Sequence, residues 1–294
     1  VVLGAYVRLT DAGLGCPDWP GCYGQLTAPA ADNANAQSAF PGVEIDTAKA
    51  WNEMIHRYFA GILGLLILAL AFIAWLNRYD SEQPVWLPFG ILLLVIFQAA
   101  LGMWTVTMLL RPSIVTLHLL MGMTTLALLW WQYFRVNGQL ALLSFGKHRM
   151  SIKGWAFGAL VVVYLQIALG GWVSTNYAAL HCPDFPTCQT HWWPETDFAG
   201  AFDLVGESDV NYEGGKLTNA QGVTVHMVHR IGAVIVLIYL STLIYLAFRH
   251  AGKSCHDAVT IIGILLAIQI GLGISNVIFI LPLPVAVAHN AFAA

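Results

Sequence analysis

The chain has 294 residues and a formal net charge of −3, with 58% hydrophobic and only 10% charged residues. A soluble globular domain carries about 25% charged residues. So few charges cannot cover a water-facing surface, which excludes an ordinary soluble enzyme, a disordered chain and a nucleic-acid-binding protein. We predict an all-α polytopic membrane protein, because helices satisfy their own backbone hydrogen bonds in lipid.

Six apolar segments are long enough to cross a bilayer, which takes about 20 helical residues. In chain order they cover residues 53–76, 86–109, 113–134, 153–174, 224–248 and 258–280. Val1 to Val7 has the character of the outer end of a further helix, and Leu283 to Ala294 that of the start of a last one. We therefore expect eight transmembrane helices, with the first and last truncated in this sequence.

Lysine and arginine are shared unevenly between two sets of predicted loops. The short loops hold seven of them: Arg78, Arg135, Lys147, Arg149, Lys153, Arg249 and Lys253. The opposite loops hold four over many more residues: Arg8, Lys49, Arg111 and Lys216. Twelve of the sixteen acids lie in the long loops 8–52 and 175–223. Because basic loops favour the cytoplasmic side, we expect the long acidic loops to face outwards.

Four sequence features occur twice in the same order, 166 to 173 residues apart. The pairs are 3–7 with 169–173, 16–22 with 182–188, 54–57 with 227–230, and Gln98, Gly102 and His118 with Gln269, Gly273 and His289. We interpret them as two pseudo-twofold related four-helix bundles in the same orientation, a parallel repeat. The predicted halves are 1–134 and 153–294, joined by a cytoplasmic linker at 135–152.

Four of the five cysteines form two C-x5-C pairs, each just beyond the outer end of a predicted helix. An oxidising outer compartment and a short proline-containing loop favour structural disulfides Cys16–Cys22 and Cys182–Cys188. Zinc binding and redox exchange with a thiol carrier are the alternatives. Cys255 lies in a predicted cytoplasmic loop and is expected to be a free thiol.

Four of the ten histidines, His56, His118, His229 and His289, lie at matching places inside predicted helices. Each of those helices follows an outer loop, so at 1.5 Å per residue the imidazoles should lie roughly 5–10 Å below the outer boundary. One such histidine is most simply a satisfied polar group between helices. Four need a shared reason, because ionisable residues inside a membrane are costly.

Haem iron is a candidate reason. A neutral imidazole binds it well, and a helix bundle can place two imidazoles on opposite faces of one porphyrin. His56 with His118, and His229 with His289, would give one bis-histidine pocket per half. Zinc or copper would prefer three or four close ligands, which this depth does not offer.

The halves differ next to the first histidine of each pair. Glu53 precedes His56 by three residues, whereas His226 precedes His229 by three, and this spacing puts each pair on one helix face. A carboxylate beside a porphyrin could move protons or position water. Alternatively, Glu53 is a first-turn acid that follows an Asn52 cap.

Arg57 and Arg230 directly follow two of these histidines. We interpret them as partners of haem propionates, with snorkelling of the side chains to the interface as the alternative.

Nearly the whole chain resembles the haem A synthase family of cytochrome oxidase assembly. The resemblance rests on Gly4-Ala5-Tyr6-Val7-Arg8-Leu9-Thr10, Gly13-Leu14-Gly15-Cys16-Pro17-Asp18-Trp19-Pro20, Glu53-Met54-Ile55-His56-Arg57, His118, His229-Arg230 and His289. It implies an eight-helix pseudo-twofold bundle with a haem b cofactor. Such a protein oxidises the C8 methyl of haem O to a formyl group, by two successive hydroxylations with loss of water.

The same resemblance implies roles for the histidines. His229 and His289 would ligate the iron of the cofactor haem b, while His56 and His118 would face the substrate haem, with Glu53 as the catalytic acid. It also matches the outer cysteine pairs to disulfide-forming cysteines of the family. Spacing alone does not tell which half reacts; that choice rests on Glu53 and on the resemblance.

Two other functions could use these histidines: a non-catalytic di-haem b-type membrane cytochrome, or a haem carrier. A transmembrane electron path needs ligand pairs near both faces, whereas all four histidines are expected near one face. The enzyme would need haem O, an external electron acceptor or donor, and haem O synthase or oxidase assembly factors as partners. It would lie in a bacterial inner or mitochondrial inner membrane, with its haem sites toward the periplasmic or intermembrane side. A homo-oligomer is left open.

Overall fold

The computed structural model describes residues 1–294 apart from 81–83, 139–148, 208 and 251–255. In this part of the chain all regular structure is helical, with only two isolated β-bridges in the loops. The helices are α1 (Val2–Leu9), α2 (Ala34–Ala39), α3 (Thr47–Leu76), α4 (Trp86–Thr107), α5 (Pro112–Val136), α6 (Arg149–Thr175), η2 (Ala178–Leu180), α7 (Phe198–Ala201), α8 (Asn219–His250), α9 (His256–Ile278) and α10 (Leu283–Phe292).

Within the described ranges, six helices are long and apolar enough to cross a membrane: α3, α4, α5, α6, α8 and α9. They confirm the six predicted spans. The two terminal helices are short, 8 residues for α1 and 10 for α10. An eight-helix bundle therefore stays a prediction.

The long helix α3 begins earlier than the sequence indicates, at Thr47. Its N-cap is Asp46, whose carboxylate accepts hydrogen bonds from the backbone N–H groups of Ala48 and Lys49, both at 3.0 Å. The alternative that Glu53 is a first-turn acid behind an Asn52 cap is wrong, because Glu53 lies well inside the helix and its first turn holds no acid. Similarly, α8 begins at Asn219, before the predicted span at 224.

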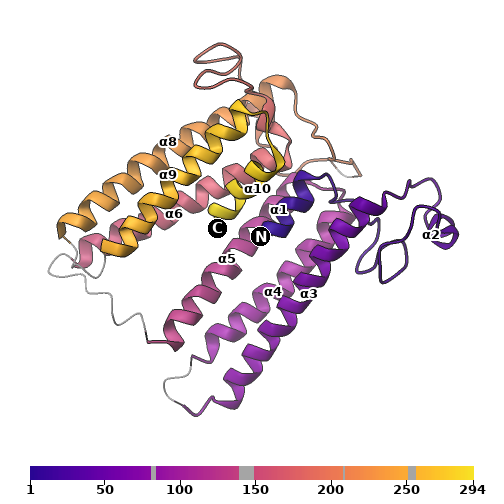
Figure 1. Ribbon diagram of the computed structural model, residues 1–294, viewed down its shortest axis with the longest axis horizontal. Coiled ribbons are helices and arrows are strands. Elements are labelled where there is room, and N and C mark those ends of the chain that lie inside the picture. The colour runs from indigo at the N-terminus through magenta and orange to yellow at the C-terminus, as the bar shows by residue number, and fades with distance from the viewer. Residues whose placement is uncertain (81–83, 139–148, 208, 251–255) are drawn as a thin grey trace. The chain divides into compact units, whose positions relative to one another are not determined.

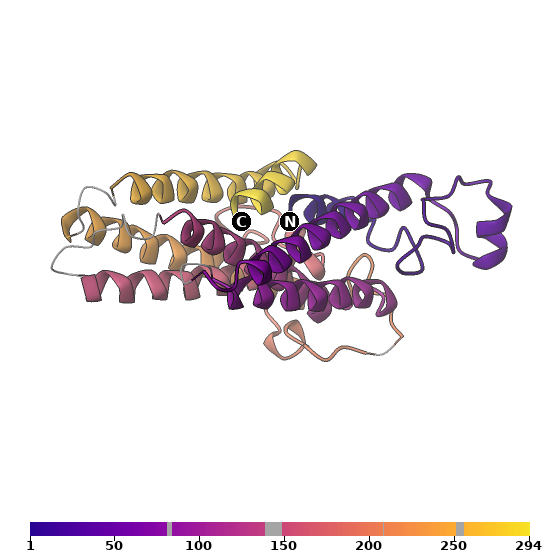
Figure 2. The ribbon, with the colours of Figure 1, turned by 90° about the horizontal axis from the view of Figure 1, so that it is seen from below.

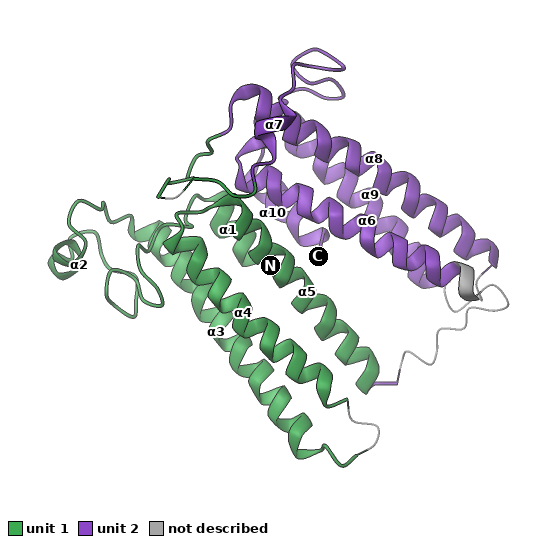
Figure 3. Cartoon of the chain, turned by 180° about the vertical axis from the view of Figure 1, so that it is seen from behind, with its two compact units in different colours: residues 1–136, 204–216 green, residues 137–203, 217–294 purple. Residues whose placement is uncertain are grey.

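The chain forms two compact units, shown in different colours in Figure 3. Unit 1 comprises Val1–Val136 and Leu204–Lys216, and unit 2 comprises Asn137–Asp203 and Leu217–Ala294. The predicted halves stay a prediction, since most of the linker 135–152 lies outside the described residues. The free thiol expected at Cys255 lies outside them too.

Each unit packs its helices in the order of the chain. In unit 1, α1 packs on α3, α3 on α4, and α4 on α5; α3, α4 and α5 run side by side (Figure 1). In unit 2, α6 packs on α8, α8 on α9, and α9 on α10. Corresponding helices of the sequence repeat thus have corresponding neighbours.

One part of the second long loop belongs to unit 1, which the sequence did not predict. In this strap, residues 204–216, the Tyr212 N–H donates to the Leu109 carbonyl at 2.9 Å. The Arg111 guanidinium donates to the Glu207 carbonyl at 2.9 Å, and Lys49 Nζ lies 3.5 Å from Glu213 Oε1. These contacts help to hold the described part of the strap on the rest of unit 1.

Burial is concentrated where the long loops meet the helices. Large side chains along the spans are exposed, such as Leu65 at 67% and Ile238 at 62%, as expected where lipid takes the place of water. In unit 1 the main cluster of buried residues instead joins the first long loop to the start of α3: Cys16, Cys22, Tyr23, Ala28, Ala36, Ile45, Ala50 and Met54. The loop bearing α2 extends beyond the N-terminal end of α3 (Figure 2).

Candidate functional site

Two disulfide-closed loops cap the ends of α3 and α8. Both predicted disulfides are present, with Cα–Cα distances of 4.7 Å for Cys16–Cys22 and 4.6 Å for Cys182–Cys188. Each loop is closed further by an antiparallel β-bridge, Cys22 with Gln25 and Cys188 with His191. The two halves of the sequence repeat therefore build the same local structure.

An aspartate organises each of these loops from within. Asp18 accepts from the N–H groups of Tyr23 at 2.6 Å and Gly24 at 2.8 Å. Asp184 accepts from the N–H groups of Gln189 at 2.5 Å and Thr190 at 3.0 Å. Both aspartates belong to the sequence repeat, but no role was predicted for them. Their position two residues after a cysteine was the available signal.

Hydrogen bonding and burial shift the pKa of three titratable groups outside the spanning helices. The Thr187 hydroxyl, together with backbone N–H groups, holds the pKa of Asp184 below its ordinary value. The Gln221 amide, with backbone N–H groups, does the same for the pKa of Asp197, which caps α7. Burial raises the pKa of Tyr23, because an ionised phenolate would lose its water.

Two arginines tie the spanning helices to the disulfide loops. Arg57, on α3, donates to the carbonyls of Asp18, at 2.9 Å, and Gly21. Arg230, on α8, donates to the carbonyls of Asp184, at 2.8 Å, and Thr187, at 2.8 Å. In the sequence repeat, Asp18 corresponds to Asp184 and Gly21 corresponds to Thr187.

Pairing of these arginines with haem propionates stays a prediction. Arg230 also donates to the carbonyl of Cys182 at 3.0 Å, and its buried Nε has no hydrogen-bond partner among the described residues. The shared structural role of both arginines is to fasten a loop to a helix.

Glu53 is buried, only 5% exposed, and both of its carboxylate oxygens accept hydrogen bonds. Oε2 accepts from the backbone N–H of Cys16 at 2.8 Å, and Oε1 accepts from Arg57 at 2.5 Å. At the corresponding place in unit 2, His226 is equally buried and its Nδ1 has no partner among the described residues. Unit 1 thus holds a fixed carboxylate where unit 2 holds an imidazole.

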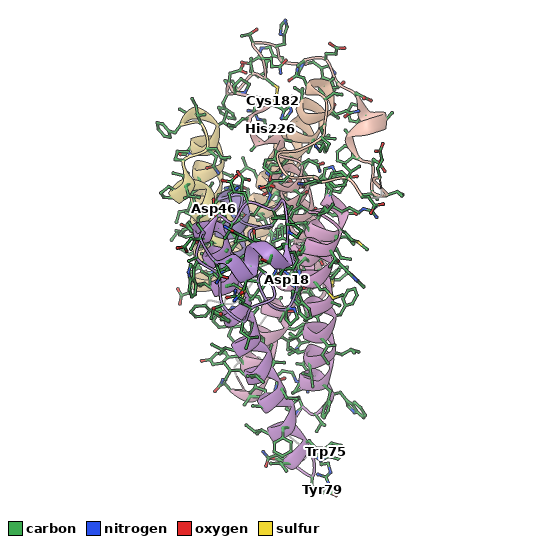
Figure 4. All side chains as sticks on the ribbon, turned by 90° about the vertical axis from the view of Figure 1, so that its right-hand side faces the viewer. Asp18, Asp46, Trp75, Tyr79, Cys182 and His226 are labelled. Carbon is green, nitrogen blue, oxygen red and sulfur yellow. A yellow bond between two sulfur atoms is a disulfide. The ribbon has the colours of Figure 1, made fainter. Side chains whose placement is uncertain are left out.

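Figure 4 shows that Asp18 and Asp46 lie at one end of unit 1, while Trp75 and Tyr79 lie at the other. The capped start of α3 and the first disulfide loop therefore share an end. Cys182 and His226 lie together at one end of unit 2 in the same view.

The four predicted ligand histidines fall into two pairs, one in each unit. His56 on α3 and His118 on α5 are near enough to interact electrostatically in unit 1. His229 on α8 and His289 on α10 are also near enough to interact electrostatically, in unit 2. The structure therefore brings together the partners that the sequence paired.

Each of the four imidazoles lies against a glycine of the neighbouring helix. A Cβ added at Gly102 would lie 3.3 Å from His118 Cε1, and one at Gly273 would lie 3.1 Å from His289 Cε1. The other two glycines are Gly4, 3.3 Å by the same measure from His56 Nε2, and Gly170, 3.1 Å from His229 Cε1. None of these glycines was predicted to lie against a histidine.

A glutamine stands one helical turn before three of these glycines. Gln98 Nε2 donates to the His118 carbonyl at 2.8 Å. Gln166 Nε2 lies 3.0 Å from both the Nδ1 and the carbonyl oxygen of His229, and Gln269 Nε2 lies 3.5 Å from His289 Nε2. The Gln-x-x-x-Gly pattern was noted in two places, but its third copy, Gln166 to Gly170, was missed.

The donor sets suit a haem better than a bare metal ion. The buried Nδ1 atoms of His118 and His289 have no hydrogen-bond partner among the described residues, so each ring has a nitrogen that is still able to form one. Within the same residues there is no group of three or more His, Cys, Asp or Glu that could hold a metal ion. A porphyrin supplies four nitrogens itself, so two imidazoles complete the iron's coordination.

Known proteins match the chain over its full length or a large part of it. A family model described as cytochrome oxidase assembly protein matches residues 1–294. The chain is 45% identical over 300 residues to the haem A synthase of Shewanella oneidensis, covering 100% of this chain and 88% of that protein. It is 27% identical over 321 residues to the haem A synthase of Caulobacter vibrioides, with 100% and 88% covered. For that of Bacillus licheniformis the identity is 28% over 199 residues, with 65% and 60% covered.

Proposed function

The chain belongs to the haem A synthase family of cytochrome oxidase assembly proteins, and from that premise we propose that it oxidises haem O to haem A. Its six apolar helices and its family indicate an integral membrane protein. We place its first and last helices in a complete eight-helix bundle, in a bacterial inner or mitochondrial inner membrane. The disulfide loops and histidine pairs would face the periplasmic or intermembrane side.

The assignment of the reacting half rests on one observation. Unit 1 contains a buried carboxylate that accepts two hydrogen bonds, and unit 2 has no carboxylate at the corresponding place. Glu53 lies one helical turn before His56, and His226 takes its place before His229. Two halves with the same histidines but one carboxylate suggest different tasks. We assign the substrate haem to His56 and His118, and a resident haem b to His229 and His289.

The reaction converts the C8 methyl of haem O to a formyl group. The methyl carbon is hydroxylated twice, and the resulting geminal diol loses water to give the aldehyde. The carbon gives up four electrons in total. If water supplies the oxygen atoms, an external acceptor must take these four electrons and four protons leave with them; if O2 supplies them, each hydroxylation reduces one O2 and takes two electrons and two protons from an external donor and solvent. A haem b held by His229 and His289 would supply redox chemistry. Haem O synthase is the expected source of the substrate.

The residues of unit 1 would position the substrate and handle protons. Glu53 is fixed by the Cys16 N–H and the Arg57 guanidinium, so its carboxylate cannot swing away from the His56 face of α3. A carboxylate held in this way can orient water or take a proton from it. The disulfide loop closes over the same helix end and limits access of bulk water.

The first test separates the enzyme from a non-catalytic cytochrome and from a haem carrier. The full-length protein would be produced together with haem O synthase, purified, and its pigments extracted and separated by chromatography. An enzyme should yield haem A alongside haem b. Finding haem b with unaltered haem O would contradict the proposed oxidation, whereas haem b alone would favour the cytochrome.

The second test concerns Glu53. Glu53→Gln keeps the size of the side chain but removes its charge, and we expect formation of haem A to fall at least tenfold, because general acid–base catalysis contributes about 10²–10⁴-fold. The haem b content should be unchanged. The matched control is Glu195→Gln, at an exposed position in the outer loop of unit 2. Equal activity in the two variants would remove Glu53 from the reaction.

A further inference from the structure

Gln166 contacts the ring of a predicted ligand from the side that would face away from iron. Its Nε2 lies 3.0 Å from His229 Nδ1, and Gly170, one turn further along α6, packs against the same ring. The side-chain oxygen of Gln166 is buried and has no partner among the described residues. The side chain of Gln166 thus has a hydrogen-bond acceptor near this ring that is not used.

The chemistry of imidazole couples the orientation of this amide to the tautomer of His229. A neutral ring carries one proton, so a ring that binds iron through Nε2 carries it on Nδ1 and must donate from there. An amide N–H pointing at Nδ1 fits only the other tautomer, with the proton on Nε2. Turning the amide about its last torsion presents Oε1 to Nδ1 instead. The turn gives up the hydrogen bond from Gln166 Nε2 to the His229 carbonyl, which keeps its helical partner, and the side chain must shift so that Oε1 does not press on that carbonyl oxygen.

The other two glutamines of the pattern do not meet their histidines in this way. Gln98 bonds to the backbone carbonyl of His118, whose Nδ1 has no partner among the described residues. Gln269 lies at Nε2 of His289, the nitrogen that would face iron, at 3.5 Å. Of these three glutamines, only Gln166 contacts Nδ1 of its histidine, the ring nitrogen that would face away from iron.

We propose that Gln166 is a positioning residue for the resident haem: its Oε1 accepts the Nδ1–H hydrogen bond of His229 and thereby fixes that ring in its iron-binding tautomer. The proposal rests on the assignment of a resident haem b to unit 2. A hydrogen-bonded ligand is more basic and less able to rotate, which suits a group that stays bound.

The test measures the unit 2 haem directly and does not depend on turnover. Full-length protein carrying His118→Ala, which breaks the unit 1 pair, would be purified from cells that make only haem b. Two substitutions would be made in this background. Gln166→Leu removes the hydrogen-bond acceptor, and Gln166→Glu replaces it with a stronger one. The matched controls are Gln98→Leu, from the same sequence pattern, and Gln132→Leu, a glutamine of α5 outside that pattern. The readouts are the midpoint potential, the low-spin ferric spectrum and the rate of haem transfer to apomyoglobin.

The two Gln166 variants should move the potential in opposite directions. A more basic ligand stabilises ferric iron, so Gln166→Glu should lower the midpoint potential and Gln166→Leu should raise it. Loss of such an outer hydrogen bond typically weakens metal binding 10- to 100-fold, and we expect Gln166→Leu to release haem correspondingly faster. Both glutamine controls should match the background protein.

Shifts of the same sign in both Gln166 variants, or none in either, would overturn the proposal and leave Gln166 a packing residue. Should Gln166→Leu fail to fold, the sign of the shift in Gln166→Glu still decides. Absence of haem from the His118→Ala background itself would instead contradict the assignment of a resident haem to unit 2, a failure of the proposed function that is read before any Gln166 variant is made.

Discussion

At the scale of single residues, glycine sets how closely a helix approaches an imidazole. Gly273 on α9 leaves the space into which His289 Cε1 and Nδ1 fit, at 3.1 and 3.7 Å from the position of an added Cβ. Gly170 on α6 does the same for His229 at the same two distances. The agreement between the two sites indicates that the histidine pair of unit 2 depends on both clearances.

Gly273→Ala should therefore disturb binding of the haem b that we propose for unit 2. The new methyl carbon would lie 3.1 Å from His289 Cε1, closer than such contacts normally come, so the ring must shift, and overpacking of this kind typically costs about 1–3 kcal/mol. We expect haem b to be lost at least about fivefold faster in transfer to apomyoglobin, since about 1 kcal/mol corresponds to roughly that factor. Gly271→Ala is the matched control, because nothing lies within 4 Å of its added Cβ. Equal rates for the two variants would show that the clearance at Gly273 does not matter.

How much of the site could be predicted depends on whether the contact is local. The approach of Glu53 to His56 and Arg57 follows from helical spacing and needs only the sequence. The N–H of Cys16, 37 residues away, completes the setting of the carboxylate, and no local pattern announces it. Gln166 was missed for the same reason: its partner His229 is 63 residues away on another helix.

At the scale of elements, each disulfide loop and the helix beneath it form one hydrogen-bonded structure. In unit 2, Asp184 gathers the N–H groups of the turn with its side chain, while its carbonyl accepts from Arg230 of α8. A single residue thereby links the inside of the loop to the spanning helix. Its carboxylate must be charged to accept so many hydrogen bonds well.

The stability of this loop should consequently depend on pH. Hydrogen bonds from Thr187 and from the turn hold the pKa of folded Asp184 below the ordinary value of about 3.9. The stabilisation is therefore complete above pH 3.9 and is lost as the pH falls through the lower, folded value. We expect Asp184→Asn to speed reduction of Cys182–Cys188 by a phosphine at pH 7, with the difference from the unaltered protein vanishing at the acid end.

The other disulfide loop of the same molecule, closed by Cys16–Cys22, serves as the control for that experiment. Cys16–Cys22 is organised by Asp18, which the substitution leaves in place. Alkylation and mass spectrometry distinguish the two cysteine pairs in each sample. A rate ratio between variant and unaltered protein that stays constant from pH 7 down to pH 3 would contradict a role for the Asp184 charge.

The spans were predictable as elements because few structures besides a membrane-spanning helix contain an apolar run of that length. The N-terminal ends of α3 and α8 were not predictable in this way. The first residues of α3 are polar and fall outside the apolar run, so only the Asp46 cap marks where the helix begins. The early start of α8 at Asn219 was missed for the same reason, since its first residues mix small and polar side chains.

At the scale of the whole molecule, the sequence repeat predicts two halves in chain order, but unit 1 also takes in the strap at 204–216. Two of the contacts that hold the strap involve backbone groups, the carbonyls of Leu109 and Glu207. Backbone groups are the same in every residue, so no pattern of side chains could reveal these bonds. The repeat therefore could not predict the place of this loop segment.

Arg111 should hold this strap against unit 1. Its hydrogen bond to the Glu207 carbonyl is exposed, and the loss of such a bond costs roughly 0.5–1.5 kcal/mol. The detached form should then become about two- to tenfold more populated, and cleavage by a glutamate-specific protease follows that population when detachment is fast. We expect Arg111→Ala to be cut after Glu207 or Glu213 faster by that factor. Lys216→Ala, an exposed cation in the same strap, should be cut like the unaltered protein. Identical cleavage rates in both variants would show that Arg111 does not fasten the strap.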